Sequence, residues 1–270
     1  MALQQVARGG LVLLGCGKMG TALLTGWLDA GLPAASVWVV EPNPSDWLKS
    51  SGVHLNVGLP KAPAVAVLAV KPQMMGAALP ALQALGNGAT LFVSIAAGTT
   101  IAMLEATLGG QTPIVRTMPN TPAMVGRGIT GICANGHAGA SGLAIARALM
   151  LAVGQVVDLD GEHQIDAVTA VSGSGPAYVF HLIEAMAAGG VAQGLSVDVA
   201  MQLARATVCG AGELAHHSNE SAAQLRINVT SPGGTTAAAL AVLMQGDTGL
   251  SALMTRAIQA AADRGRELGT

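Results

Sequence analysis

Glycine stands at the first, third and sixth places of the segment Gly15-Cys16-Gly17-Lys18-Met19-Gly20. Glycines at this spacing let the backbone turn sharply and approach a pyrophosphate, which then lies at the N-terminus of a helix. In a chain with 36 glycines the spacing alone is a weak signal. An aliphatic run precedes this segment, however, and a helix-like stretch follows it. We therefore predict a dinucleotide-binding loop that uses Gly15, Gly17, Lys18, Met19 and Gly20; the alternative is a glycine-rich turn without a ligand.

Two polar residues follow the next β-branched run, and they bear on the choice of dinucleotide. Glu41 ends that run and Asn43 lies two residues later. A carboxylate at this place accepts hydrogen bonds from ribose hydroxyls and repels a 2′-phosphate. Glu41 therefore favours NADH, although Asn43 and Ser45 could donate hydrogen bonds to a phosphate. NADPH and NADH both stay open as the cofactor.

Three further segments close aliphatic runs, at residues 69–72, 94–98 and 116–122. In a doubly wound sheet, ligands bind beyond the carboxyl ends of the strands, so we expect these segments to meet at one edge. A lysine in the first segment offers positive charge, and small residues such as Ala96 let a flat ring lie close. An ordinary surface lysine and ordinary rigid loops are the alternatives. The predicted cofactor contacts here are Ala69, Val70, Lys71, Pro72 and Ala96.

The second half of the chain has two glycine-rich breaks within helical sequence. Residues 172–176 have the hydroxyls and the proline that are typical of a helix start. Residues 230–236, Thr-Ser-Pro-Gly-Gly-Thr-Thr, offer backbone N–H groups and hydroxyls at the N-terminus of an apolar helix. Such a loop can hold an anion, for example a substrate carboxylate. The alternative for this loop is a plain helix cap.

These loops need an α/β scaffold to hold them, and the first 160 residues have its pattern. Aliphatic runs alternate there with helix-like stretches, and continuous apolar strands between helices indicate a parallel sheet covered on both faces. We expect strands at residues 11–15, 36–41, 64–71, 90–96, 113–117, 129–134 and 156–159.

No strand pattern appears after residue 160. Helices are expected there at 162–171, 176–193, 197–217, 235–245 and 248–268. The prediction is a Rossmann-type doubly wound domain at 1–160 followed by an all-helical dimerisation and substrate domain at 161–270.

The composition is 51% hydrophobic and 10% charged, with a net charge of −2. So few charges predict that apolar surface is buried against another subunit. The net charge argues against a nucleic-acid partner.

Pro80 and several glycines break the longest uncharged stretch into pieces shorter than the ~20 residues of a spanning helix, so no membrane partner is expected. Cys16, Cys133 and Cys209 have no CxxC spacing, which indicates reduced thiols in a cytoplasmic protein without a metal site.

The motifs together are similar to one family. GCGKMG, AVKPQ, SIAAG, RTMPNTPAMVGRGITG, IDAVTAVSGSGPAYVF and VTSPGGTT occur in the order and spacing of pyrroline-5-carboxylate reductases, from about residue 11 to residue 268. The resemblance implies reduction of Δ1-pyrroline-5-carboxylate to L-proline with NAD(P)H, the last step of proline biosynthesis. It also implies an interlocked homodimer that often assembles further into a decamer.

The resemblance also implies roles for single residues. Asn56 and Asn228 match cofactor contacts of the family, and Glu162 matches an acid near the bound imino acid. Thr235 and Thr236 match residues that hold the substrate, through a backbone N–H and a hydroxyl respectively. Glu41 departs from the small hydroxyl residue of many NADPH-preferring members. The segment 219–222 also departs, since it lacks the usual His-Pro, and a change in a surface turn is expected there.

The expected mechanism needs no strong acid, because a protonated imine accepts a hydride readily. The substrate carboxylate would lie on the N–H groups around Gly233, Gly234 and Thr235, assisted by Ser231. Thr236 would be catalytic, bonding the imine nitrogen and relaying its proton.

Three other functions stay open on the sequence: a reductase of another cyclic imine, a dinucleotide-binding regulator without chemistry, and a structural oligomer with an unused cofactor loop. A β-hydroxyacid dehydrogenase fits poorly, because no lysine follows Lys71.

Overall fold

The computed structural model describes residues 2–269, which form two compact units. One unit contains the residues up to Ser174 together with those from Ala261 onward, and the other is Gly175–Ala260. The chain therefore leaves the first unit once and returns to it. The domain ranges 1–160 and 161–270 stay a prediction.

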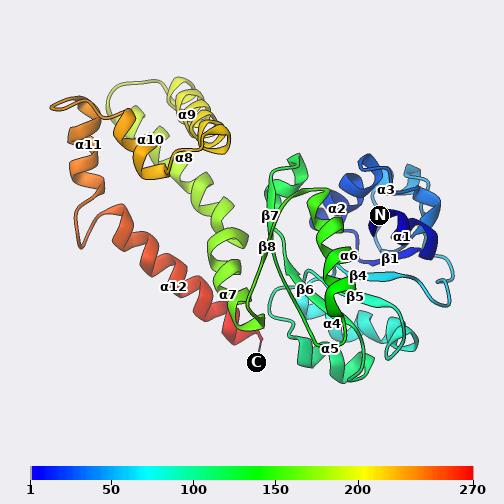
Figure 1. Cartoon of the computed structure of the whole chain (residues 1–270). Coiled ribbons are helices and arrows are strands. Elements are labelled where there is room, and N and C mark those ends of the chain that lie inside the picture. The colour runs from blue at the N-terminus through cyan, green and yellow to red at the C-terminus, as the bar shows by residue number, and fades with distance from the viewer. Residues whose placement is uncertain (1, 270) are drawn as a thin grey trace. The chain divides into compact units, whose positions relative to one another are not determined.

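An eight-stranded sheet, in the order β3-β2-β1-β4-β5-β6-β7-β8, forms the centre of the first unit (Figure 1). Its strands are β1 (Leu11–Leu14), β2 (Val37–Val40), β3 (His54–Leu55), β4 (Val65–Leu68), β5 (Leu91–Ser94), β6 (Ile114–Met118), β7 (Gly128–Ala134) and β8 (Gly154–Asp158). All seven predicted strands exist, most of them shorter than expected. The two-residue strand β3 was not predicted.

The last two strands, β7 and β8, run against the other six, which corrects the prediction of a parallel sheet. β7 pairs antiparallel with β6, whereas every other neighbouring pair is parallel. A parallel neighbour needs a crossover of about a dozen residues or more. Only residues 119–127 join β6 to β7, and Gly126 turns the chain with a φ of +68°. Residues 119–127 therefore form a direct connection between two adjacent antiparallel strands, and not a crossover.

Helices cover both faces of the sheet because the strand side chains alternate. Leu11 and Leu13 of β1 belong to one buried cluster, together with residues of α2 and α6. Val12 and Leu14 belong to a second cluster, with residues of α4, η2 and α5. The helices of this part are α1 (Ala2–Gly9), α2 (Lys18–Asp29), η1 (Ala34–Ser36), α3 (Asp46–Ser50), α4 (Pro72–Ala78), η2 (Leu79–Leu85), α5 (Ile101–Leu108), η3 (Thr121–Val125) and α6 (Gly139–Leu151).

The segment expected as one helix at 162–171 consists of three short turns of different pitch. These are η4 (Glu162–Gln164), α7 (Ile165–Val168) and the π-helix η5 (Thr169–Gly173). Short π-helices are rare and often lie at functional sites. This π-helix ends in Ser172 and Gly173, whose small size lets Met118 and Asn120 approach closely.

Helices make up the second unit: α8 (Gly175–Ala192), α9 (Val197–His217), α10 (Ala222–Asn228), α11 (Thr235–Leu243) and most of α12 (Leu250–Leu268). Ser196 caps α9 and Ser221 caps α10 through their hydroxyl oxygens. α10 was not predicted, because the segment before it was interpreted as a surface turn. No helix within residues 2–269 is long and apolar enough to cross a membrane.

Candidate active site

The phosphate loop joins β1 to α2, and its three motif glycines have different surroundings. Gly15 has a φ of +88°, and a Cβ there would come within 2.8 Å of the Ala69 carbonyl oxygen. A Cβ on Gly20 would lie 2.7 Å from the Gly15 oxygen. At Gly17 a Cβ would meet nothing within 4 Å. The first and third glycines therefore allow close packing, and the second faces open space.

The N-terminus of α2 has no side-chain cap, since its N-cap residue is Gly17. The first N–H groups of a helix have no partner within the helix, and the helix dipole places partial positive charge beside them. This end of the helix can therefore bind an anion such as a pyrophosphate.

A cavity of about 600 Å³ opens at the carboxyl ends of the central strands. Its lining includes predicted cofactor residues from three separate loops: Gly17, Lys18, Met19, Ala69, Val70, Lys71, Pro72 and Ala96. The expectation that these loops share one edge of the sheet is met. The cavity wall also contains residues that were not among the predicted cofactor contacts: Ile95, Ala97, Met118, Pro119, Asn120, Thr121 and Gly173.

Asn120 is the most informative of the added residues, because it is buried and both ends of its amide are bonded. Its Nδ2 donates to the Ser172 carbonyl at 3.1 Å, and its Oδ1 accepts from the Ile129 N–H at 2.9 Å. Asn120 thus fixes the loop after β6 to the π-helix beside the cavity. The sequence signal was the segment 116–122, which was expected at this edge of the sheet without a role for Asn120 itself.

Glu41, Asn43 and Asn56 lie next to the phosphate loop, outside the cavity lining. The Glu41 carboxylate accepts from the Cys16 N–H at 2.8 Å and from the Asn43 N–H at 2.9 Å. The Asn56 side chain bonds both backbone groups of Glu41. The contacts of these three residues with a cofactor stay a prediction.

Glu162 has two partners in the first unit. Its Oε1 accepts from the Arg116 guanidinium at 2.7 Å and from the Ile101 N–H at 2.7 Å. The Arg116 side chain is 5% exposed, so its guanidinium is buried and its charge is balanced by Glu162. Glu162 therefore links the middle of β6 to the start of α5. Its predicted contact with substrate stays a prediction.

The loop predicted to hold the substrate belongs to the second unit, where it leads into α11. Gly233 has a φ of +69°, and the Gly234 N–H donates to the Ser231 carbonyl at 3.0 Å. Gly234 is the N-cap of α11 and has no side-chain cap, so Thr235 and Thr236 begin the helix with N–H groups that have no partner within it. The turn can hold a carboxylate by these groups.

Asn228 ends α10, shortly before this loop. Its Nδ2 donates to a Glu220 carboxylate oxygen at 2.8 Å, and its Oδ1 accepts from the Gln224 side chain at 2.8 Å. Its role as a cofactor contact stays a prediction.

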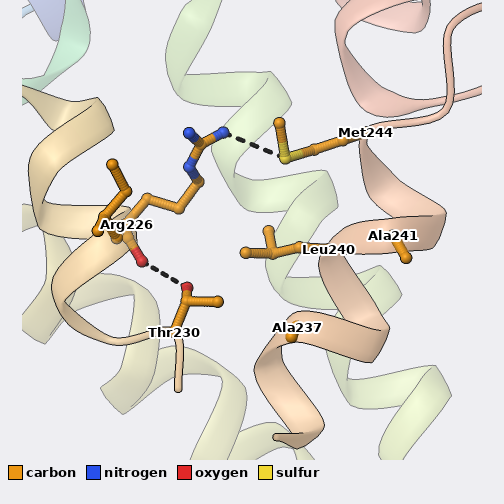
Figure 2. A pocket seen from close by; sticks show the side chains of 7 residues that line it. Arg226, Thr230, Ala237, Leu240, Ala241 and Met244 are labelled. Carbon is orange, nitrogen blue, oxygen red and sulfur yellow. Dashed lines mark hydrogen bonds between the residues drawn. The ribbon is translucent and has the colours of Figure 1, made fainter. Parts of the chain in front are cut away.

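Figure 2 shows a second cavity, of about 480 Å³, between α10 and α11. Arg226 spans it and donates to the Met244 sulfur at 3.1 Å. The remaining lining is mostly aliphatic: Ile227, Thr230, Ala237, Leu240 and Ala241. None of the predicted substrate residues lines this cavity.

Comparison with known proteins agrees with this geometry. Residues 162–268 match the family model for pyrroline-5-carboxylate reductase dimerisation, and residues 11–98 match the one for NADP oxidoreductase, coenzyme F420-dependent. The pyrroline-5-carboxylate reductase of Pseudomonas aeruginosa is 43% identical over 96% of this chain and 96% of its own. The chain belongs to the pyrroline-5-carboxylate reductase family.

Solved structures of the family have the same fold. The pyrroline-5-carboxylate reductase of Coxiella burnetii has a TM-score of 0.89 at 35% identity, over 97% of this chain and 99% of that one. The Plasmodium falciparum enzyme, solved with NADP bound, has a TM-score of 0.84 at 29% identity, over 98% of this chain and 100% of that one. The predicted family, α/β fold class and NAD(P)H-dependent reductase function are confirmed.

Two buried thiols near the site are held in the neutral form. Burial raises the pKa of Cys16 in the phosphate loop, and the nearby Glu41 carboxylate raises it further. Burial also raises the pKa of Cys133 to about 11, with Glu162 as a second cause. Because the thiolate is the nucleophilic form, neither thiol is suited to attack a substrate.

Proposed function

We propose that this chain reduces Δ1-pyrroline-5-carboxylate to L-proline with NAD(P)H. The observation that carries the proposal is the cavity at the sheet edge, where three loops meet beside the free N-terminus of α2. The cavity fits a dinucleotide, because Gly17 leaves the helix N-terminus open and the alanines Ala96 and Ala97 present little bulk. The cofactor, when bound, supplies the hydride.

In this proposal the residues around the cavity hold and orient the cofactor. The N–H groups at the start of α2 bind the pyrophosphate, and Lys71 adds positive charge at the end of β4. Asn120 keeps the loop after β6 in place. The positions of these groups are set by the fold before binding, so little ordering is needed at the moment of reaction.

The substrate carboxylate lies on the loop before α11, around Gly233, Gly234 and Thr235, with Ser231 assisting. Because the Gly234 N–H donates to the Ser231 carbonyl, the donors to the carboxylate are the N–H groups at the start of α11. The open N-terminus of α11 supports this assignment, since it offers unpaired donors and partial positive charge. Thr236 is the catalytic residue: its hydroxyl bonds the imine nitrogen and relays the proton. An imine already protonated needs orientation more than it needs a strong acid.

The active form in this proposal is a homodimer, which assembles further into a decamer. Support comes from large apolar side chains on the helical unit that are more than half exposed, among them Phe180 at 61% and Leu203 at 53%. Monomeric proteins rarely expose contiguous apolar surface of this kind. We also propose a cytoplasmic location, which the three free cysteines support.

Steady-state oxidation of NADH and NADPH in the presence of pyrroline-5-carboxylate tests the function. Thr236→Ala should lower kcat about 100-fold and leave cofactor affinity unchanged. Thr248→Ala, the same chemical change elsewhere in the unit, is the control and should keep full turnover.

Unchanged turnover in Thr236→Ala would remove this residue from the mechanism. A wild-type protein that oxidises neither cofactor with pyrroline-5-carboxylate, but does so with another cyclic imine, would replace the proposed substrate.

A further inference from the structure

Asn56 has a left-handed backbone conformation, with a φ of +52°, which residues other than glycine rarely adopt. Its N–H donates to the Val39 carbonyl at 2.8 Å, which ties it to β2. Its side-chain Oδ1 accepts from the Glu41 N–H at 2.9 Å, and its Nδ2 donates to the Glu41 carbonyl at 2.8 Å. Asn56 therefore bonds both backbone groups of Glu41 and fixes the backbone of that residue at the end of β2.

The Glu41 carboxylate is fixed at its other end as well. One oxygen accepts from the Cys16 N–H within the phosphate loop, and the other accepts from the Asn43 N–H just after β2. A charged acceptor with two N–H donors loses both bonds when it rotates, and each such bond contributes roughly 1.5–3 kcal/mol. The negative charge is therefore held beside Gly17, the glycine that lines the cavity.

The segment after β2 offers no compensating positive charge. Residues 37–48 contain no Lys or Arg. Lys49 follows, and its ammonium already pairs with Asp46 at 2.8 Å. A site for a 2′-phosphate needs a cationic or hydroxyl-rich surface at this strand end, whereas a carboxylate there suits the two free hydroxyls of an unphosphorylated ribose.

We propose that Glu41 is the residue that makes this protein select NADH over NADPH, and that Asn56 positions it. The remaining lone pairs of the carboxylate accept from the ribose hydroxyls of NADH. A 2′-phosphate meets a carboxylate that cannot turn away without breaking its two N–H bonds. The proposal deepens the proposed function, on which its turnover assay depends, whereas its binding assay does not depend on any substrate.

The test measures the dissociation constants of NADH and NADPH by quenching of protein fluorescence, and kcat/KM for both cofactors. Wild type should prefer NADH at least about tenfold in both measurements. Glu41→Gln removes the charge and should bring the ratio close to one, and Glu41→Ser should favour NADPH. Asn56→Gly tolerates the positive φ but loses both side-chain bonds to Glu41, and should reduce the preference for NADH several-fold. The control Asp29→Asn removes one negative charge elsewhere in the unit and should leave the ratio unchanged.

A wild-type protein that binds NADPH as tightly as NADH overturns the proposal. So does an equal shift in Asp29→Asn and Glu41→Gln, because the effect would then be one of net charge. An unchanged ratio in Asn56→Gly removes the positioning role of Asn56. If the cofactors bind with the expected ratio but pyrroline-5-carboxylate is not reduced, the proposed function fails while the selectivity holds.

Discussion

Glu162 is bonded to Arg116 in the structure and is also predicted to contact the substrate, and substitutions can separate these roles. Glu162→Ala leaves the buried Arg116 guanidinium unpaired and should lower the free energy of unfolding by about 3 kcal/mol. Glu162→Gln keeps an oxygen acceptor for Arg116, so its free energy of unfolding should fall by less. The measurement is urea unfolding, with Glu267→Gln as control, because that carboxylate belongs to an exposed pair with Arg264 and should change stability by less than about 1 kcal/mol.

Kinetics of Glu162→Gln then decide the second role. A higher KM for pyrroline-5-carboxylate with an unchanged melting temperature would indicate a substrate contact. A lower melting temperature with an unchanged KM would contradict that contact and leave a structural ion pair.

The Cys133 thiol predicts a loss of stability at alkaline pH. Its pKa is raised to about 11 in the folded protein from an ordinary value of 9.0, so only the unfolded chain ionises between these values. The stabilisation is fully present below pH 9 and decreases as the pH rises toward 11, by about 1.4 kcal/mol for each unit of pKa difference. Urea unfolding at pH 8, 9 and 10 should show this decrease, and Cys133→Ala should lack it. Identical pH curves for the two proteins would contradict the prediction.

At the scale of residues, the sequence could predict those contacts that depend on short spacing. The phosphate loop and the strand-end segments 69–72 and 94–98 depend on local glycine and small-residue patterns, and they line one cavity. The hydrogen bonds between Asn56 and Glu41 join residues 15 apart in the sequence, and the bond from Asn120 to Ser172 joins residues 52 apart. Such pairings depend on how the chain folds back, which no local pattern encodes.

At the scale of elements, two glycines in helices predict opposite effects of the same substitution. A Cβ on Gly26 in α2 would lie 2.3 Å from a Val153 methyl group and 3.0 Å from the Ala152 oxygen. Gly26→Ala should therefore lower the free energy of unfolding by about 1–3 kcal/mol. A Cβ on Gly76 in α4 meets nothing within 4 Å, so Gly76→Ala should raise it by up to about 1 kcal/mol.

Thermal unfolding of both variants beside the wild type tests this pair. Equal melting temperatures for Gly26→Ala and Gly76→Ala would contradict the packing of α2 against residues 152–153.

Elements with clear end signals were predicted best. The helix expected at 197–217 has the same bounds in the structure, because Ser196 caps it and an apolar face runs along it. The direction of β7 and β8 was predicted wrongly, and the π-helix η5 was not predicted. Strand direction depends on the length and turn of the connection, and a π-helix differs from an α-helix by a single inserted residue, so hydrophobic periodicity distinguishes neither case.

At the scale of the whole molecule, the helical unit lacks a large core of its own. Within the described residues, its buried cluster consists of three alanines, Ala187, Ala200 and Ala204. We therefore expect sedimentation velocity to show a dimer or a larger assembly at micromolar concentration. Leu203→Glu should shift the distribution toward the monomer, since Leu203 is 53% exposed on α9.

The matched control is Leu151→Glu, because Leu151 is also 53% exposed but lies in the sheet-containing unit. A wild-type monomer, or an equal shift in both variants, would contradict assembly through the helical unit.

The return of the chain at Ala261 makes the helical unit an insertion within the nucleotide-binding fold. The last turns of α12 supply buried Ala262 and Gly265 to the first unit, and Leu268 packs against Gly98 in the loop after β5. A gene shortened after codon 174 would thus encode an incomplete sheet domain with an uncovered surface. Expression of that domain alone therefore calls for a chain in which residues up to 174 are joined by a linker to those from 261 onward.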